Sequence, residues 1–333
     1  MRPDTTTAPE EVAGMQQMKI AKPRFLRWRG GIVIGIMVCV MSCAALTQIE
    51  TKPQLPPEPF AISGDVPSQA FLEASETELR LELERHPESA RALYKLGLVL
   101  RQENKPKESL ETYTRAASLQ KPDAEQLRSV ALDYVLLDDY RDAIHWLQTA
   151  LSFEPGNAEV LYSLGRCFYT QGDYRKAEAL YLKVLEINPD HLRAEENLGL
   201  AYDAENQPEK AEATLRIAAA RAAKQPSDEW PFLNLGSVLV DHNRAAEAVP
   251  VLQIATRIAP KSAPCHEKLG RALEDSGNTM EGVKELEMAV QLDPKNPGLH
   301  FELGHAYRQS GAQEKARAEF ALSQELSKER DRK

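Results

Sequence analysis

The sequence predicts an all-α solenoid of about seven helix pairs, and three periodic features indicate it. A Leu-Gly dipeptide, or an equivalent of it, recurs every 34 residues through most of the 333-residue chain. Each repeated unit holds two apolar-periodic stretches of about 13 residues, which is a helical pattern. Small residues recur at fixed positions in both stretches. Because one helix pair cannot bury its apolar face alone, we expect the pairs to stack on one another.

The amino-terminal 29 residues are basic, whereas the rest of the chain is acidic. The net charge is −9, and residues 1–29 contribute +3, so the remainder carries −12. An acidic body does not suit nucleic acid, whose phosphates require a basic face. We therefore expect no nucleic-acid partner, and we expect the basic cluster to set membrane orientation.

Residues 30–46 form the only long apolar run, with 17 residues and no charge. As a helix the run would span about 26 Å, which is marginal for a bilayer core of about 30 Å. Its end, Val40-Met41-Ser42-Cys43, resembles the bacterial lipobox and makes Cys43 a candidate lipidation site, although Met41 departs from that pattern. Three interpretations stay open: a lipoprotein signal, an uncleaved anchor helix and a simple cleaved signal, with Met15 and Met18 as alternative starts. All three predict a body that faces the periplasm or the exterior.

Two short segments connect this run to the repeats. Residues 47–67 hold five prolines, which favour an extended, semi-rigid spacer. Residues 68–89 read as a lone helix that caps the first repeat.

The repeat array is predicted over residues 90–330. Its glycines are spaced by 68, 34, 37, 34 and 34 residues, where the first step is a double period with Val130-Ala131 in the middle. The 37-residue step contains a three-residue insertion, before which an alanine-rich second helix is expected to run to Gln225-Pro226. The predicted units are 90–123, 124–157, 158–191, 192–225, 229–262, 263–296 and 297–330.

Within a unit, turn signals and small residues define two helices. Segments such as "QGDY" and "DSGN" separate the two apolar stretches. The Gly or Ala at position 8 and the Ala at position 20 allow the two helices to approach closely. Pro155, Pro189, Pro260 and Pro294 end second helices and begin the turn into the next unit.

The unit that begins at Ala158, "AEVLYSLGRCFYTQGDYRKAEALYLKVLEINPDH", resembles the tetratricopeptide repeat (TPR). Large, small, aromatic, turn and proline positions of that family are occupied by Leu161, Leu164, Gly165, Phe168, Gly172, Tyr174, Ala177, Tyr181 and Pro189. The resemblance extends over about 240 residues and implies a right-handed α-solenoid.

In this family the ligand usually lies against the first helices, at positions 2, 5, 6, 9 and 12 of each unit. The partner-binding groove predicted from this resemblance comprises Tyr94, Arg128, Tyr162, Arg166, Tyr169, Arg193, Asn197, Trp230, Asn234, Arg271 and Phe301. Tyr, Trp and Arg are the residue types that dominate binding hot spots. The alternative is that the charged residues pair between repeats and bind nothing, as Arg193 with Glu159 and Glu196 with Arg166.

No catalytic, cofactor or metal site is predicted. The chain contains no Walker loop, HExxH, nucleophile elbow or Rossmann fingerprint. His300 and His305 are five residues apart, which does not place them on one helix face. Cys167 and Cys265 lie three units apart, too far for a disulfide, so we expect two buried thiols.

Together these features predict a non-catalytic scaffold that is held at a membrane and binds a partner protein or an extended peptide. Envelope assembly, secretion and pilus biogenesis are settings that resemblance to tethered repeat lipoproteins implies. Two alternatives stay open: an accessory subunit of an envelope enzyme system for glycosyl transfer or cytochrome maturation, and self-association through the open carboxy-terminal repeat.

Overall fold

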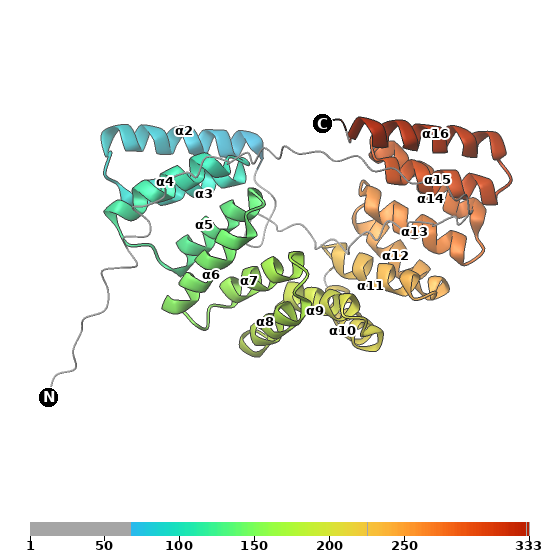
Figure 1. Ribbon diagram of the computed structural model, residues 1–333, viewed down its shortest axis with the longest axis horizontal. Coiled ribbons are helices and arrows are strands. Elements are labelled where there is room, and N and C mark those ends of the chain that lie inside the picture. Colours follow the sequence, from blue (N-terminus) through green and yellow to red (C-terminus); the bar gives the residue numbers. More distant parts are fainter. Residues whose placement is uncertain (1–67, 225, 331, 333) are drawn as a thin grey trace, which may run out of the picture. The chain divides into compact units, whose positions relative to one another are not determined.

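The computed structural model describes residues 68–224, 226–330 and 332, and these residues form fifteen α-helices and no strand (Figure 1). The predictions for residues 1–67, including the apolar run and Cys43, lie outside the described residues. None of the described helices combines the length and the apolar character that a membrane crossing needs.

The helix α2, Gln69–Arg85, is followed by seven helix pairs. The first helices of the pairs are α3 (Ala90–Gln102), α5 (Ala124–Leu136), α7 (Ala158–Thr170), α9 (Leu192–Ala204), α11 (Trp230–Asp241), α13 (Ala263–Asp275) and α15 (Pro297–Gln309). The second helices are α4 (Pro106–Leu119), α6 (Tyr140–Phe153), α8 (Tyr174–Ile187), α10 (Pro208–Ala222), α12 (Ala245–Ile258), α14 (Thr279–Leu292) and α16 (Gln313–Arg330). The helix α10 ends at Ala222, before the Gln225-Pro226 pair at which we expected it to stop.

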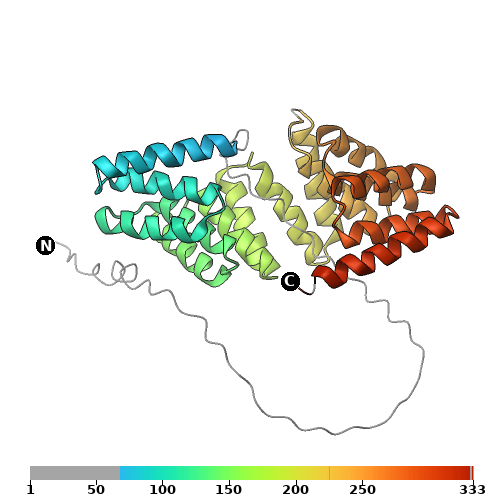
Figure 2. The ribbon, with the colours of Figure 1, turned by 90° about the horizontal axis from the view of Figure 1, so that it is seen from above.

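The described helices fall into two compact units. Unit 1 contains α2, α3 and α4, and unit 2 begins at Asp123 and contains α5 to α16. In unit 1, α2 packs along α3, and in unit 2, α16 packs along α15, as both views show (Figures 1 and 2).

Each pair turns at a residue in the left-handed region, and this residue always occupies position 15 of the repeat. The residues, with their φ angles, are Asn104 (60°), Asp138 (58°), Gly172 (81°), Asn206 (57°), Asn243 (59°), Gly277 (90°) and Gly311 (84°). Glycine adopts this conformation without a Cβ clash, and Asn and Asp tolerate it better than other residues. This requirement explains why the turn signals in the sequence contain only Gly, Asn or Asp.

The two helices of a pair touch where the first helix carries glycine at position 8. A Cβ added at Gly165 would lie 2.6 Å from Cε1 of Tyr181, and one at Gly199 would lie 2.6 Å from Cγ of Leu215. Such separations are shorter than van der Waals contact, so a larger residue would push the helices apart. The close approach expected from the sequence is therefore present.

In unit 2 the first helices lie closer to one another than the second helices do. Each first helix contacts the first helix of the next pair, from α5 and α7 through to α13 and α15. Within the described part of the chain, no two second helices make such contacts. The side of a stack on which neighbours approach most closely is its inner side, so the first helices form the inner wall of unit 2.

Candidate functional site

The candidate site is the inner wall of unit 2, defined as positions 2, 5, 6, 9 and 12 of α5, α7, α9, α11, α13 and α15. The structure places the predicted groove residues at very different depths. Those that are buried are Tyr94 in unit 1 and Arg128, Tyr162, Tyr169, Asn197 and Asn234 in unit 2. Those that are partly exposed are Arg166, Arg193, Trp230 and Arg271, and Phe301 is 49% exposed.

The buried tyrosines serve as packing and hydrogen-bonding groups between helices. The amide nitrogen of Asn197 donates to the Tyr162 hydroxyl over 3.1 Å, which joins α9 to α7. The Tyr162 ring lies 4.9 Å from the His191 ring, and burial raises the pKa of Tyr169. In unit 1 the Tyr94 hydroxyl donates to the backbone carbonyl of Gln120 over 2.7 Å. A ligand-contacting role for these side chains stays a prediction.

Two arginines of the predicted groove are held by carboxylates from the same wall or its connecting loops. Arg128 pairs with Glu125 through two nitrogens, at 2.6 and 2.9 Å. Arg193 lies 3.5 Å from the Asp228 carboxylate, which the three-residue insertion contributes. Glu159, which we considered as a partner of Arg193, lies 3.4 Å from His191, and its pKa is lowered by His191 first and by the nearby charge of Arg193 as well.

Two carboxylates at the ligand-facing positions, neither of them in the predicted groove set, stand out by their burial. Glu196 on α9 is 1% exposed, and neither of its carboxylate oxygens accepts a hydrogen bond from the described residues, Arg166 included. Desolvation by burial is the main reason why the pKa of Glu196 rises to about 8, and Asp228 adds to it while Arg193 opposes it.

Glu274 on α13 is the second such carboxylate. It is 9% exposed, and one of its oxygens has no hydrogen-bond partner within the described residues. Burial first, then the charges of Glu302 and Asp275, raise the pKa of Glu274 to about 7, while Arg271 lowers it. A Cβ added at Gly282, which occupies position 20 of this repeat, would lie only 2.9 Å from Cγ of Glu274. The glycine therefore leaves space for the Glu274 side chain.

The last repeat ends the inner wall with exposed aromatic rings. Phe301 lies 4.6 Å from the His305 ring and 5.7 Å from Phe320, and the Arg308 guanidinium lies 5.7 Å from the Phe320 ring. Burial, with Arg308 nearby, lowers the pKa of His305. Unlike Tyr162, Phe301 can contact a ligand without repacking the repeat.

Two histidines with a structural role were missed by the sequence analysis. His266 contacts the Glu285 carboxylate at 2.7 Å and the Pro260 carbonyl at 3.1 Å, and His300 makes the same contacts with Glu319 and Pro294 at 2.7 and 3.0 Å. Each ring thus ties a second helix to the proline turn that precedes its own repeat. The useful signal was the 34-residue spacing of His266 and His300, rather than the five-residue spacing of His300 and His305.

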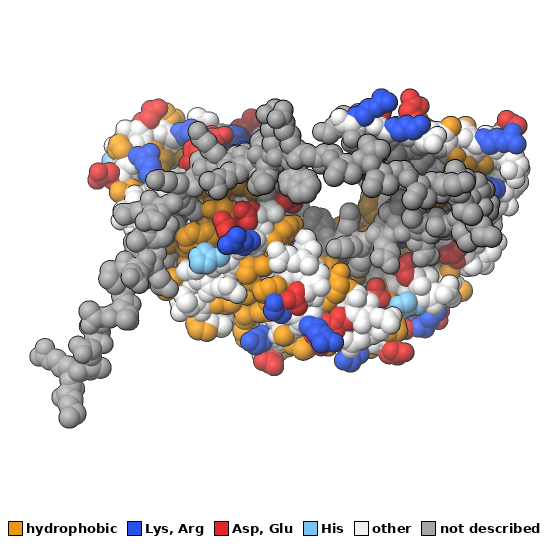
Figure 3. All heavy atoms as spheres, in the orientation of Figure 1, with side chains coloured by type: hydrophobic (Ala, Val, Ile, Leu, Met, Phe, Trp, Pro, Cys, Tyr) orange, Lys and Arg blue, Asp and Glu red, His pale blue; other side chains and the backbone are white. Residues whose placement is uncertain are grey.

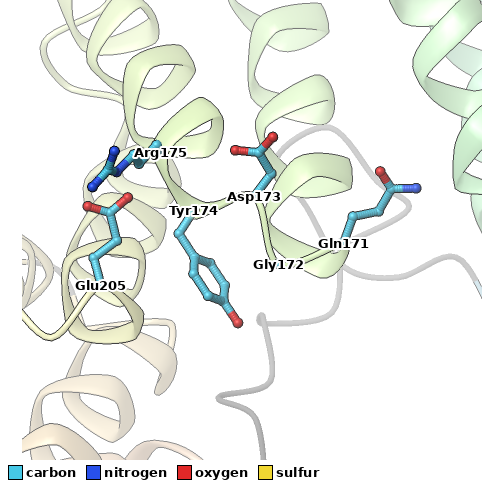
Figure 4. Close-up of a pocket in the computed structure, with 6 residues that line it drawn as sticks. All are labelled: Gln171, Gly172, Asp173, Tyr174, Arg175 and Glu205. Carbon is cyan, nitrogen blue, oxygen red and sulfur yellow. The ribbon is translucent and has the colours of Figure 1, made fainter.

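Outside the inner wall, the described residues form two pockets, one of which lies in unit 1 between α2, α3 and α4. A pocket open to solvent lies at the α7–α8 turn, where Arg175 and Glu205 point toward one another (Figure 4). The Asp173 carboxylate in this pocket accepts a hydrogen bond from the Lys176 backbone amide and so caps α8, which gives it a structural role. Among the described residues, no group of three His, Cys, Asp or Glu side chains could hold a metal ion. Cys167 and Cys265 are both buried and form no disulfide with each other, as expected.

The outer surface of unit 2 is mixed in character. Figure 3 shows hydrophobic side chains among charges of both signs over the α5–α10 part of the unit. Single apolar residues on second helices, such as Leu182, Ile217 and Met280, are 40, 51 and 67% exposed. Scattered exposure of this kind is normal for a soluble surface and does not define a site.

Stacked helix pairs with an inner wall of first helices define a helical-repeat class of protein. Two family models, both described as tetratricopeptide repeat, match the sequence over residues 135–195 and 168–230 and over residues 69–124 and 267–329. These matches cover more than half of the chain. The chain therefore belongs to the tetratricopeptide repeat family.

Solved structures agree with this assignment at the level of the fold. A tetratricopeptide repeat protein from Parabacteroides merdae ATCC 43184 is similar with a TM-score of 0.58 and 19% identity, over 72% of this chain and 93% of that one. The APC/C hetero-tetramer Cut9-Hcn1 is similar with a TM-score of 0.60 and 14% identity, over 77% of this chain, which spans 50% of that chain. No curated protein matches the sequence.

Proposed function

We propose that this protein is a non-catalytic scaffold, held at a membrane, that binds a partner protein or an extended peptide along the inner wall of unit 2. TPR proteins generally mediate protein–protein interactions, and the repeat family is generally non-catalytic. The observation that carries the proposal is that buried carboxylates without hydrogen-bond donors and the exposed ring of Phe301 lie on the same series of first helices.

The test is recovery of partners from cells by the full-length chain. Cells would be cross-linked, their membranes solubilised and the co-purifying proteins identified. The variant Trp230→Ala with Phe301→Ala removes two wall rings that are at least partly exposed, and the control Ile217→Ala with Met280→Ala changes exposed residues of second helices. We expect partners to be lost with the wall variant and kept with the control. Equal recovery with both variants would refute a wall-based function.

The membrane tether belongs to the proposal as well, and the basic cluster, the apolar run and the prolines of residues 1–67 support it. Mass spectrometry of the mature amino terminus distinguishes the three interpretations. Diacylglyceryl on Cys43, lost in Cys43→Ser, would identify a lipoprotein, whereas an intact Met terminus in the membrane fraction would identify an anchor. A chain recovered only from the soluble fraction would exclude the tether.

Self-association through the last repeat is the alternative mode of partner binding. Leu322 on α16 is 38% exposed and lies in the helix that ends the array. Concentration-dependent sedimentation that is abolished by Leu322→Glu would support this mode, and a monomer at all concentrations would exclude it.

A further inference from the structure

Several bases of the inner wall are paired with an acid from the same part of the structure. Arg193 lies 3.5 Å from Asp228, and Arg271 lies 3.7 Å from Asp241. Lys268 lies 3.8 Å from Glu267. A ligand that carried acidic groups would therefore have to break existing ion pairs before it could use these cations.

Several acids of the same wall have no such counter-ion. Glu196, Glu274 and Glu302 form no ion pair with the described residues, and Asp203 has only His242, at 3.2 Å. They lie on the first helices α9, α13 and α15 of unit 2, whereas α11 between them contributes no acid at the wall positions. When they are ionised, these carboxylates create a negative potential that attracts cations.

Two of these acids are also short of hydrogen bonds. Both oxygens of Glu196 and one oxygen of Glu274 are buried without a donor among the described residues. A buried acceptor that lacks a partner destabilises the folded chain, and a donor supplied by a ligand would recover that loss. Cationic donors make the stronger bonds to a carboxylate.

We infer that the bound partner segment is basic, an extended peptide whose lysine or arginine side chains donate to Glu196 and Glu274 on the inner wall. This inference rests on the proposed function, because it names the chemistry of the segment that the wall would bind. The exposed ring of Phe301 at the end of the wall suits the same chemistry, since aromatic faces attract cations.

The dimensions of the wall set the length of the probe. Helices that pack against one another lie about 10 Å apart, so the step from α9 through α11 to α13 covers about 20 Å and that to α15 about 30 Å. An extended chain advances about 3.3 Å per residue, so a peptide of about ten residues reaches all four helices.

The experiment measures binding of fluorescein-labelled peptides of this length to the full-length chain in detergent. The three probes repeat Lys-Ala-Ser, Gln-Ala-Ser or Glu-Ala-Ser, so they differ only in charge. The protein variants are Glu196→Gln and Glu274→Gln, singly and together. The matched controls, Glu209→Gln and Glu281→Gln, remove an exposed carboxylate from the second helix of the same two repeats.

We expect the lysine peptide to bind at least about tenfold more tightly than the glutamine peptide, and each wall substitution to weaken it about tenfold. The controls should leave its affinity unchanged. The glutamate peptide should not bind.

The pH dependence gives a second readout. Arg193, Glu195 and Asp228 surround Glu196, and Arg271, Asp275 and Glu302 surround Glu274, with the pKa values near 8 and 7 in the free chain. A cation stabilises the ionised carboxylates, so binding lowers both pKa values and releases protons. Affinity for the lysine peptide should therefore rise as the pH increases toward about 8, and this rise should disappear in the double variant.

The two proposals fail in different ways. If the glutamine or glutamate peptide binds as tightly as the lysine peptide, or the wall substitutions change nothing, the basic-segment inference is wrong while wall binding can still stand. If no peptide binds and the Trp230→Ala, Phe301→Ala variant also keeps every cellular partner, both the inference and the proposed function are wrong.

Discussion

At the residue scale, the burial of Glu196 makes the folded chain less stable at neutral pH than it would be with an uncharged residue at this position. The pKa of this carboxyl is about 8 when folded against an ordinary value of 4.5, so the folded state holds a proton that the unfolded state releases. The stabilisation of the folded state by the protonated Glu196 carboxyl is complete below pH 4.5 and is lost as the pH rises toward 8.

Glu196→Gln should therefore raise the free energy of unfolding at pH 7 by about 2–3 kcal/mol, since each pKa unit corresponds to about 1.4 kcal/mol. Urea unfolding at pH 7 and at pH 4.5 measures the effect, which should vanish at the lower pH. A variant that is less stable than the natural chain at pH 7 would show that Glu196 is ionised and paired in the folded state.

Glycine at position 8 provides a second prediction at this scale. A methyl group at Gly199 would lie 2.6 Å from Cγ and 2.8 Å from Cδ2 of the buried Leu215. Gly199→Ala should lower the free energy of unfolding by about 2 kcal/mol through overpacking. Gly156→Ala, at a site with nothing within 4 Å, is the control and should change stability little. Equal effects of the two substitutions would contradict the close-approach argument.

At the element scale, α2 is attached to the first repeat by a small charge cluster. Lys105 lies 2.8 Å from Glu76 on α2 and 2.7 Å from Glu103. The hydrogen bond from Lys105 is the largest reason why the pKa of Glu76 falls to about 2. Because that pKa is depressed, the ionised Glu76 stabilises the packing of α2 fully above pH 4.5, and this stabilisation is lost as the pH falls toward 2.

Lys105→Met should accelerate amide exchange in α2 about fivefold at neutral pH, which corresponds to about 1 kcal/mol. In the natural chain, exchange corrected for intrinsic rates should accelerate in α2 as the pH falls from 4.5. Arg85→Met, at an exposed end of the same helix, is the matched control. Unchanged protection of α2 in Lys105→Met would show that apolar packing alone holds the helix.

The histidines of the last two repeats give a further prediction at this scale. Each ring ties a proline turn to a second helix, as His266 ties Pro260 to Glu285. His266→Ala should cost about 1–2 kcal/mol, because it removes two hydrogen bonds and leaves a carboxylate without its donor. Faster exchange confined to the turn at Pro260 and the start of α13 would be the signature. The exposed His145 offers the control substitution to Ala.

At the scale of the whole molecule, the contacts of each repeat are limited to its neighbours. In unit 2 the first helices contact only adjacent pairs, so stability should approximate a sum of repeat and interface contributions. Gly199→Ala should therefore raise exchange in α8 to α11 and leave α15 and α16 nearly unchanged. A uniform loss of protection throughout unit 2 would instead indicate a single cooperative unit.

Much of the fold could be predicted because its determinants are local. The position-15 turn residues, such as Asn206 and Gly277, adopt positive φ values that few residue types tolerate. Glycine at position 8 reports a contact with the second helix of the same repeat, sixteen residues away in the case of Gly199 and Leu215. Both signals lie within one repeat, and they recur in successive repeats, so the same structure is indicated several times.

The candidate site was predicted less completely because its determinants are not local. The period of the sequence indicates on which face of a helix a residue lies. How deeply its side chain is buried depends on how the next repeat packs against it. Tyr162 and Phe301 share position 5, and yet Tyr162 is 3% exposed and Phe301 is 49% exposed. Tyr162 packs against His191, which caps α9, and against Asn197 of the following repeat, whereas no described repeat follows Phe301.

The sequence by itself determined the family, the 34-residue period, the helix pairs and their turns, because each depends on residue types at short, repeated spacings. The tertiary structure alone decided which wall residues have hydrogen-bond or ion-pair partners. It buried Glu196 without a donor, gave Arg193 the Asp228 of the insertion as its partner, and used Gly282 to accommodate Glu274. These outcomes depend on contacts between helices of different sequence position, and so does the proposal that the wall takes a basic segment.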